Sequence, residues 1–127
     1  MSDATTRGIR VQVESFYDEE RSSPQDSYYF FTYQVRISNL GEEPAQLLSR
    51  EWIITDGNGE TQRVQGPGVV GEQPVIAPGG EFEYMSFCPL QTPVGAMQGS
   101  YLMVLKSGES FGAEIAPFSL AAPHAVN

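Results

Sequence analysis

The sequence predicts a single all-β domain, an immunoglobulin-like antiparallel β-sandwich of about seven strands. Three observations predict it. Apolar residues recur at every second position over most of the chain, which is the period of a half-buried strand. Turn-forming Gly, Pro, Asn and Asp residues separate these stretches, and none of the segments between them has a helical period. The length of 127 residues suits one core, so we expect one domain over residues 1–127, ordered from about residue 7 to residue 123.

The first predicted strands lie on either side of a loop. Ile9, Val11 and Val13 alternate with polar residues in the first strand. Turn chemistry over Ser22–Ser27 then leads into Tyr28–Ser38, whose odd positions are all large, so this segment is the strongest strand in the sequence.

The next two predicted strands form a hairpin after a turn over Asn39–Pro44. Leu48, Trp52 and Ile54 are expected to share one face of the first of them. Asp56, Gly57, Asn58 and Gly59 form a tight reversal, since Gly and Asn tolerate positive φ, and the segment Thr61–Gln65 pairs back.

The segment Gly66–Gly80 is predicted to be a long ordered loop that covers part of the domain. It carries apolar residues that a fully exposed loop has little reason to hold, and its three prolines lower the entropy lost on ordering. Three further strands follow, around Phe82–Cys88, Met97–Leu105 and Phe111–Ile115, and Pro117 and Pro123 close the ordered part. The predicted core contains Tyr29, Phe31, Tyr33, Val35, Ile37, Trp52, Ile54, Tyr84, Tyr101, Met103 and Phe111.

Charge and composition exclude several classes of partner. The chain has 16 acidic and 7 basic residues and a formal charge of -9, which repels nucleic acid and anionic membranes. The polar start Met1–Arg10 has no signal-peptide core, and the chain has no apolar run of the ~20 residues that cross a bilayer. A lone cysteine fits a reducing compartment without a disulfide framework, so we expect a cytoplasmic protein.

The most distinctive motif is Gly66-Pro67-Gly68-Val69-Val70-Gly71, which matches G-x-G-x-x-G. In a dinucleotide-binding fold such glycines let backbone amides approach a pyrophosphate at the start of a helix. Here a proline lies inside the motif and no amphipathic helix follows it. We therefore expect the glycines to shape a loop that offers a recognition surface, with pyrophosphate binding as the alternative.

The chain offers little catalytic chemistry. Its only histidine, His124, is the fourth residue from the end, where a catalytic geometry is hard to hold, and Cys88 occupies an apolar strand position. The acidic run Asp18, Glu19 and Glu20 is a weak candidate for Mg²⁺ or Ca²⁺, because it lacks the alternating ligand spacing of a calcium loop. We expect no enzymatic activity, no cofactor and no tight metal site.

Aromatic residues are the better indication of a binding surface. Tyr28 and Phe30 lie on the strand face opposite Tyr29 and Phe31, so this strand is apolar on both sides at its start. The second face is either covered by the Gly66–Gly80 loop or offered to a partner, most plainly another protein.

Several strings of residues resemble the ApaG family. They are Gln46-Leu47-Leu48-Ser49-Arg50 with Trp52, Asp56-Gly57-Asn58-Gly59, the run Val64 to Pro74, Ile76-Ala77-Pro78-Gly79, and Thr92-Pro93 with the run Gly95 to Tyr101. The resemblance covers about Arg7 to Pro123 and implies a fibronectin type III-like sandwich, in agreement with the period of two.

The resemblance also implies a function. It indicates a small cytoplasmic protein without an established enzymatic activity. It also links the protein to cobalt and magnesium efflux, and to a gene neighbourhood that includes the gene for diadenosine tetraphosphate hydrolysis. Similar domains in eukaryotes are attached to F-box proteins and to a polymerase delta-interacting protein, where they look like protein-binding modules. The expected function is therefore a non-enzymatic protein-interaction module, with homo-oligomerisation left open. The alternative is binding of a nucleotide or dinucleoside polyphosphate through Gly66–Gly71, a motif that the family shares.

Overall fold

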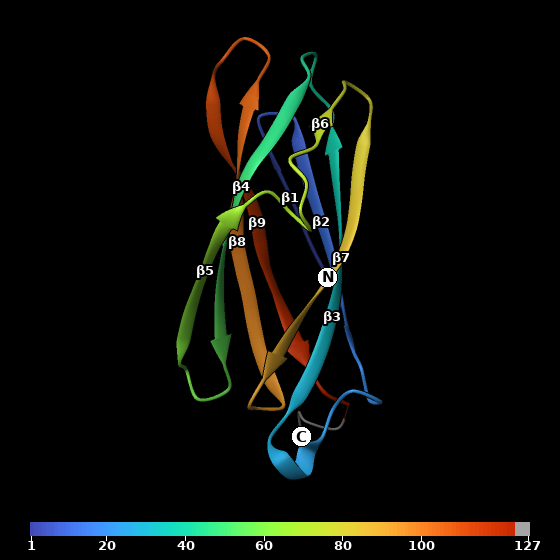
Figure 1. Cartoon of the computed structure of the whole chain (residues 1–127), viewed down its shortest axis with the longest axis vertical. Helices are drawn as coiled ribbons and strands as arrows, with labels where there is room; N and C mark the ends of the chain where they lie inside the picture. Colours follow the sequence, from blue (N-terminus) through green and yellow to red (C-terminus); the bar gives the residue numbers. More distant parts are fainter. Residues whose placement is uncertain (124–127) are drawn as a thin grey trace.

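The computed structural model describes residues 1–123, and these residues form two packed antiparallel sheets (Figure 1). The first sheet has the strand order β1-β2-β3-β7; the second has the order β5-β4-β8-β9, with β6 paired to β4. The strands are β1 (Ser2–Thr6), β2 (Ile9–Tyr17), β3 (Tyr29–Asn39), β4 (Ala45–Asp56), β5 (Thr61–Pro67), β6 (Val75–Ile76), β7 (Glu81–Leu90), β8 (Val94–Leu105) and β9 (Ser110–Ala121). The predicted all-β sandwich is confirmed.

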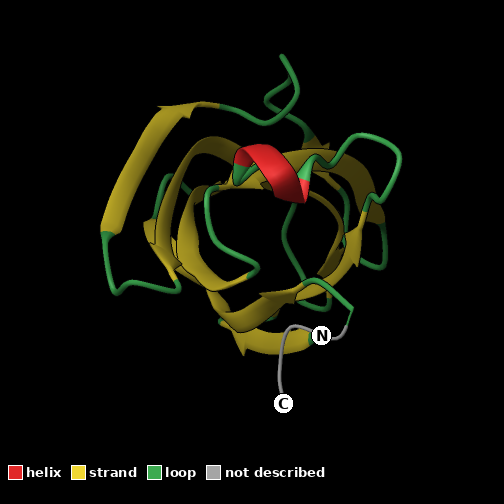
Figure 2. Cartoon of the chain, turned by 90° about the horizontal axis from the view of Figure 1, so that it is seen from below, coloured by secondary structure: helices red, strands yellow, loops and turns green. Residues whose placement is uncertain are grey.

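The strands wrap around a common interior when the molecule is viewed from below (Figure 2). Within residues 1–123 the only helical segment is the 3-10 turn η1 (Pro24–Asp26), which lies in the predicted loop Ser22–Ser27. The described part of the chain has no helix with the length and apolar character that a membrane span requires.

The core lies between the sheets and contains most of the predicted residues. Phe31, Tyr33, Val35, Ile37, Trp52, Tyr84, Tyr101 and Met103 are buried as expected. Tyr29, Ile54 and Phe111 are only partly buried and pack against the edge of the core. These three partly buried residues lie toward strand ends, where one sheet no longer covers the other completely.

Two β-bulges change which residues face the core. In β4 the pairing with β8 shifts between Leu47 and Ser49, so Leu47 is buried and the predicted inward residue Leu48 is not. One extra residue reverses the alternation, so odd-numbered residues such as Leu47 face the core before the bulge and even-numbered residues such as Trp52 face it after the bulge. The prediction for Leu48 is therefore wrong, although Trp52 beyond the bulge is buried as predicted.

A second bulge explains how β9 continues through a proline. The register of β9 with β8 shifts between the pairs Met97–Phe118 and Gly99–Ile115, which places the extra residue beside Pro117. Proline has no N–H for the ladder and is tolerated at bulges. The last predicted strand, drawn to Ile115, is therefore too short, since β9 continues past Pro117 to Ala121.

The N-terminal strand β1 lies outside the ordered part that the sequence predicts. Its residues Ser2–Thr6 carry no apolar alternation, and they are held by antiparallel pairing with Ile9–Val13 of β2. On this side the two sheets close. Ser15 Oγ donates to the Ser119 carbonyl oxygen at 2.9 Å, and the Glu114 N–H donates to Thr6 Oγ1 at 3.0 Å.

Candidate functional site

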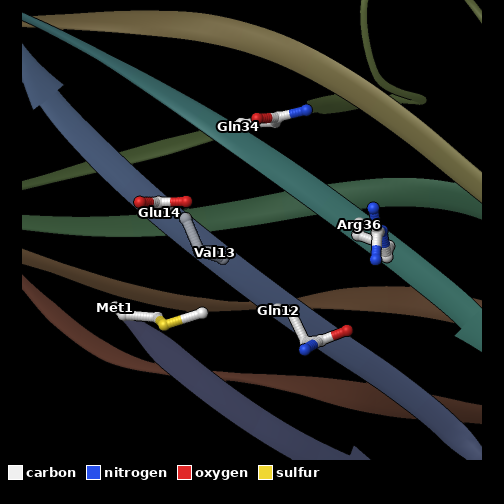
Figure 3. Close-up of a pocket in the computed structure, with 6 residues that line it drawn as sticks. All are labelled: Met1, Gln12, Val13, Glu14, Gln34 and Arg36. Carbon is white, nitrogen blue, oxygen red and sulfur yellow. The ribbon is translucent and has the colours of Figure 1, made fainter.

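The outer face of the first sheet is divided into a polar half and an apolar half. The polar half holds a shallow depression of about 150 Å³, which Figure 3 shows beside Gln12 and Glu14 of β2 and Gln34 and Arg36 of β3. Arg36 Nε donates to Glu83 Oε1 at 2.6 Å. These side chains form the solvated face that is usual for an antiparallel sheet.

The apolar half gathers five side chains from β2, β3, β7 and the segment before β3. We call it the aromatic patch, and its residues are Phe16, Tyr28, Phe30, Met85 and Phe87. Phe87 is 62 % exposed and Met85 is 55 % exposed, although both lie in the middle of a regular strand. Large apolar groups that stay exposed together on a sheet face make this half a candidate interaction surface.

Strand register brings these residues together. Phe16 of β2 and Phe87 of β7 are both paired with Thr32 of β3, so the two phenyl groups flank a short side chain in one row across the sheet. Phe30 stacks on Phe87 with ring centroids 5.4 Å apart, and the guanidinium carbon of Arg21 lies 5.6 Å from the Phe30 ring centroid. Phe30 therefore packs against Phe87 of the aromatic patch and against the Arg21 guanidinium.

A second feature is an opening between the edge strands β5 and β7, which we call the open side. No hydrogen bond joins these two strands in the described residues, in contrast to the closed side at β1 and β9. The opening holds a depression of about 300 Å³, with walls that include Tyr33, Trp52, Val64, Cys88 and Pro89. A neighbouring depression of about 490 Å³ extends it toward Tyr28, Asp56 and Glu60.

The buried thiol at the open side and the buried phenols at and behind it are held neutral. Burial raises the pKa of the Cys88 thiol to about 11. Burial also raises the pKa of Tyr33, Tyr84 and Tyr101, and the hydroxyl groups of the last two share a hydrogen bond in the core. A thiol or phenol whose pKa is raised further above 7 stays protonated at physiological pH, and the protonated form is a poor nucleophile and a poor base.

The Gly66–Gly71 motif joins β5 to a segment that crosses between the sheets toward β6 (Figure 1). Each of its glycines has a local structural role. The Arg50 guanidinium lies over Gly66 and donates to the carbonyl oxygens of Pro67 and Gly68 at 3.0 and 2.9 Å. Gly68 has φ +59, and a Cβ there would lie 2.1 Å from the Glu72 carbonyl oxygen; Gly71, with φ +80, sits in a tight turn.

Two backbone amides of this motif, and that of Glu72 beside it, donate to carbonyl oxygens of the chain. The Gly68 N–H donates to the Leu48 carbonyl oxygen at 2.8 Å. Val69 and Glu72 exchange two backbone hydrogen bonds, at 2.8 and 2.9 Å, around the turn. A pyrophosphate cradle needs several free N–H groups that point at one anion, and here the neighbouring side chain of Glu72 is itself acidic.

The structure divides the predicted cover into an inner and an outer part. Val69 and Ile76 are buried in the core between the sheets, while Val70 is 55 % exposed and Val75 is 64 % exposed. The predicted long loop is also shorter than expected, because Gly66 and Pro67 belong to β5 and Val75 and Ile76 form β6. The segment Gly66–Gly80 therefore fills space between the two sheets with Val69 and Ile76, and it does not cover Phe30 on the outer face of the first sheet.

Val70 carries backbone strain that a substitution should relieve. It has φ +43, which is costly for a β-branched residue, and it precedes Gly71 in a two-residue reversal of the kind that favours Asn-Gly. We expect Val70→Asn to raise the free energy of unfolding by about 1 kcal/mol. The midpoint of guanidinium-induced unfolding measures this change. Val69→Asn is the control and should destabilise the fold, since it buries an amide; unchanged stability in Val70→Asn would contradict the strain argument.

The candidate metal ligands do not converge. Asp18 accepts from the Arg21 guanidinium at 3.2 Å and also from the Arg21 backbone N–H, and Glu19 and Glu20 follow it in the loop before η1. Residues 1–123 contain no group of three or more His, Cys, Asp or Glu side chains arranged to hold a metal ion. His124 lies outside the described residues.

Sequence reasoning identified Tyr28 and Phe30 but missed the rest of the aromatic patch. Phe16, Met85 and Phe87 come from β2 and β7, and nothing in the local sequence shows that these strands flank β3. One signal was present. Met85 and Phe87 stand in the phase of Glu81 and Glu83, where a solvated face would be polar throughout.

Comparison with known proteins gives one consistent family. The ApaG domain matches residues 19–105. The chain is 54% identical over 127 residues to Protein ApaG of Anaeromyxobacter sp. (strain K), with all of both chains covered. It is 57% identical over 124 residues to Protein ApaG of Methylobacterium radiotolerans, covering 98% of this chain and 95% of that one.

A solved structure agrees in both fold and sequence. The ApaA protein from Bordetella pertussis superposes with a TM-score of 0.89 at 51% sequence identity, and the match covers 91% of this chain and 94% of that chain. The family match, the identities above half over nearly the full length and the shared two-sheet architecture lead to the same conclusion: the chain belongs to the ApaG family.

Proposed function

We propose that this chain is a protein-binding module without catalytic activity of its own, and that it recognises its partner through the aromatic patch. The observation that carries the proposal is the exposure of Met85 and Phe87 on a sheet face whose other half is polar. Aromatic residues and methionine are enriched where proteins bind one another, because they bury a large apolar area at a small cost in side-chain entropy.

The chemistry of the described residues supports a binding role over an enzymatic one. The buried thiol and phenols at the open side stay protonated near neutral pH, and the carboxylates are dispersed or paired with arginines. A catalytic centre needs a base or nucleophile whose pKa is adjusted toward its task. In this proposal the family's association with cobalt and magnesium efflux arises through contact with a protein of that pathway, in the cytoplasm, and the ions themselves bind elsewhere.

The alternative function, pyrophosphate or dinucleoside polyphosphate binding at Gly66–Gly71, has weaker support. Three of the amides in and beside the motif already donate to carbonyl oxygens, and the nearby Arg50 guanidinium donates to two more. An anion would have to displace these bonds in a chain whose net charge opposes it.

The test is capture of partner proteins from an extract by immobilised protein. We expect Phe87→Glu to remove the proteins that the unsubstituted chain retains, because a charge placed in an apolar contact is strongly disfavoured. Leu102→Glu is the matched control, since Leu102 is also an exposed apolar strand residue, 42 % exposed, but lies on the second sheet. Equal loss in both variants, or no loss in Phe87→Glu, would contradict the assignment of the aromatic patch.

A further inference from the structure

We propose that the free edge of β7 accepts an extended segment of the partner as an added strand, which fills the open side between β7 and β5. The inference rests on the proposed function and specifies how the partner is bound. It combines three properties of β7: its unpaired backbone edge, the aromatic patch on one of its faces, and the opening on the other.

The hydrogen-bond pattern shows which backbone groups of β7 are free. The Phe30 carbonyl oxygen accepts from the Asp18 N–H at 2.9 Å, and the Phe30 N–H donates to Ser22 Oγ at 2.9 Å, so both groups point away from β7. At the other end of β3, the Asn39 N–H donates to the Gly80 carbonyl oxygen at 3.0 Å, toward β7. Antiparallel pairs alternate between bonded and non-bonded types along a ladder.

It follows that the odd-numbered residues of β7 are non-bonded partners of β3. The N–H and C=O groups of Glu83, Met85 and Phe87 therefore point outward from the edge of the sheet, and no described residue pairs with them. Pro89 has the same phase and lacks an N–H, which ends the row of donors at Phe87. The edge thus offers a short, defined pairing length, as in recognition by strand addition.

An added strand would present alternate side chains to two different surfaces. Those on the outer face would lie beside Met85 and Phe87 of the aromatic patch. Those on the inner face would enter the depression lined by Tyr33, Trp52 and Val64. Trp52, which forms part of the wall of this depression, has a buried Nε1–H with no hydrogen-bond partner in the described residues.

Charge at both ends of the pairing stretch identifies the occupant as a segment with basic flanks. Glu81 and Glu83 share the single guanidinium of Arg36 at one end, and Asp56 and Glu60 line the depression beyond Pro89 at the other. A second copy of this chain is a poor occupant, because it would bring its own Glu81 and Glu83 and a charge of -9 to the same edge.

The probe is a fluorescent ten-residue peptide of alternating valine and threonine with two lysines at each end. We expect saturable binding that weakens at least tenfold when alternate peptide nitrogens are methylated. On the protein, Met85→Pro removes an N–H that points outward and leaves the hydrogen bonds between β7 and β3 in place, because proline at this phase is already accommodated at Pro89. We expect Met85→Pro to bind the peptide at least tenfold more weakly than Met85→Ala. Both variants lose the methionine side chain, so the comparison isolates the backbone.

Amide hydrogen exchange of the unsubstituted protein gives a second measurement that does not depend on a variant. The amides of Glu83, Met85 and Phe87 should exchange rapidly alone and become protected with the peptide, whereas Tyr84 and Ser86 should change little. Absence of saturable binding, or equal affinity of Met85→Pro and Met85→Ala, overturns strand addition. If Phe87→Glu still abolishes capture in that case, the proposed function stands alone. A dimer that Met85→Pro dissociates would overturn the choice of occupant.

Discussion

Trp52→Ala is expected to lower the free energy of unfolding by about 3 to 5 kcal/mol, the usual cost of truncating a large buried aromatic residue. Trp52 is 3 % exposed and lies at the centre of an aromatic cluster. Its ring centroid is 5.2 Å from that of Tyr33, 5.9 Å from Phe118 and 6.4 Å from Tyr101, all in edge-on arrangements. The substitution removes these contacts from both sheets at once.

Guanidinium-induced unfolding followed by far-ultraviolet circular dichroism measures this loss, since the variant lacks the only tryptophan. Phe87→Ala is the matched control. It truncates an aromatic strand residue that is 62 % exposed, and its stability should stay within about 0.5 kcal/mol of the unsubstituted protein. A midpoint for Trp52→Ala that stays close to that of Phe87→Ala would remove Trp52 from the core and disprove the register of β4.

Gly68→Ala should destabilise the domain by about 2 to 5 kcal/mol, combining the cost of a left-handed alanine with that of overpacking. The φ of +59 is one reason, and the position of the added Cβ, 2.1 Å from the Glu72 carbonyl oxygen, is the larger one. That oxygen accepts the Val69 N–H, so moving it would disturb the turn that holds Val69 in the core.

Gly71→Ala separates the structural role of the motif from a role in binding. Gly71 has φ +80 but no heavy atom within 4 Å of an added Cβ, so alanine there should cost only about 1 to 2 kcal/mol. A cradle for pyrophosphate would depend on both glycines. We expect no thermal shift with millimolar ATP; a saturable shift that is lost in Gly71→Ala while the fold persists would favour the pyrophosphate alternative.

Much of the fold follows from local sequence. The alternation in Tyr29–Ile37 and in Phe82–Cys88 is a property of neighbouring residues, and burial of every second side chain converts it directly into strands. The turn at Asp56–Gly59 is likewise local, since the Asp56 side chain accepts from the Asn58 and Glu60 backbone N–H groups. The predicted sandwich depended only on such short-range information.

The tertiary structure decided what no single segment contains. The bulges beside Leu48 and Pro117 reverse which side chains face the core, and each arises because two strands must pair over their whole length. Strand order makes β7 an edge and places Phe87 beside Phe30. The period of two assigns a residue to one face of its own strand. Pairing between distant segments determines which faces adjoin and which edges remain free. The candidate site consists of one such face and one such edge, so it could not be read from any single segment.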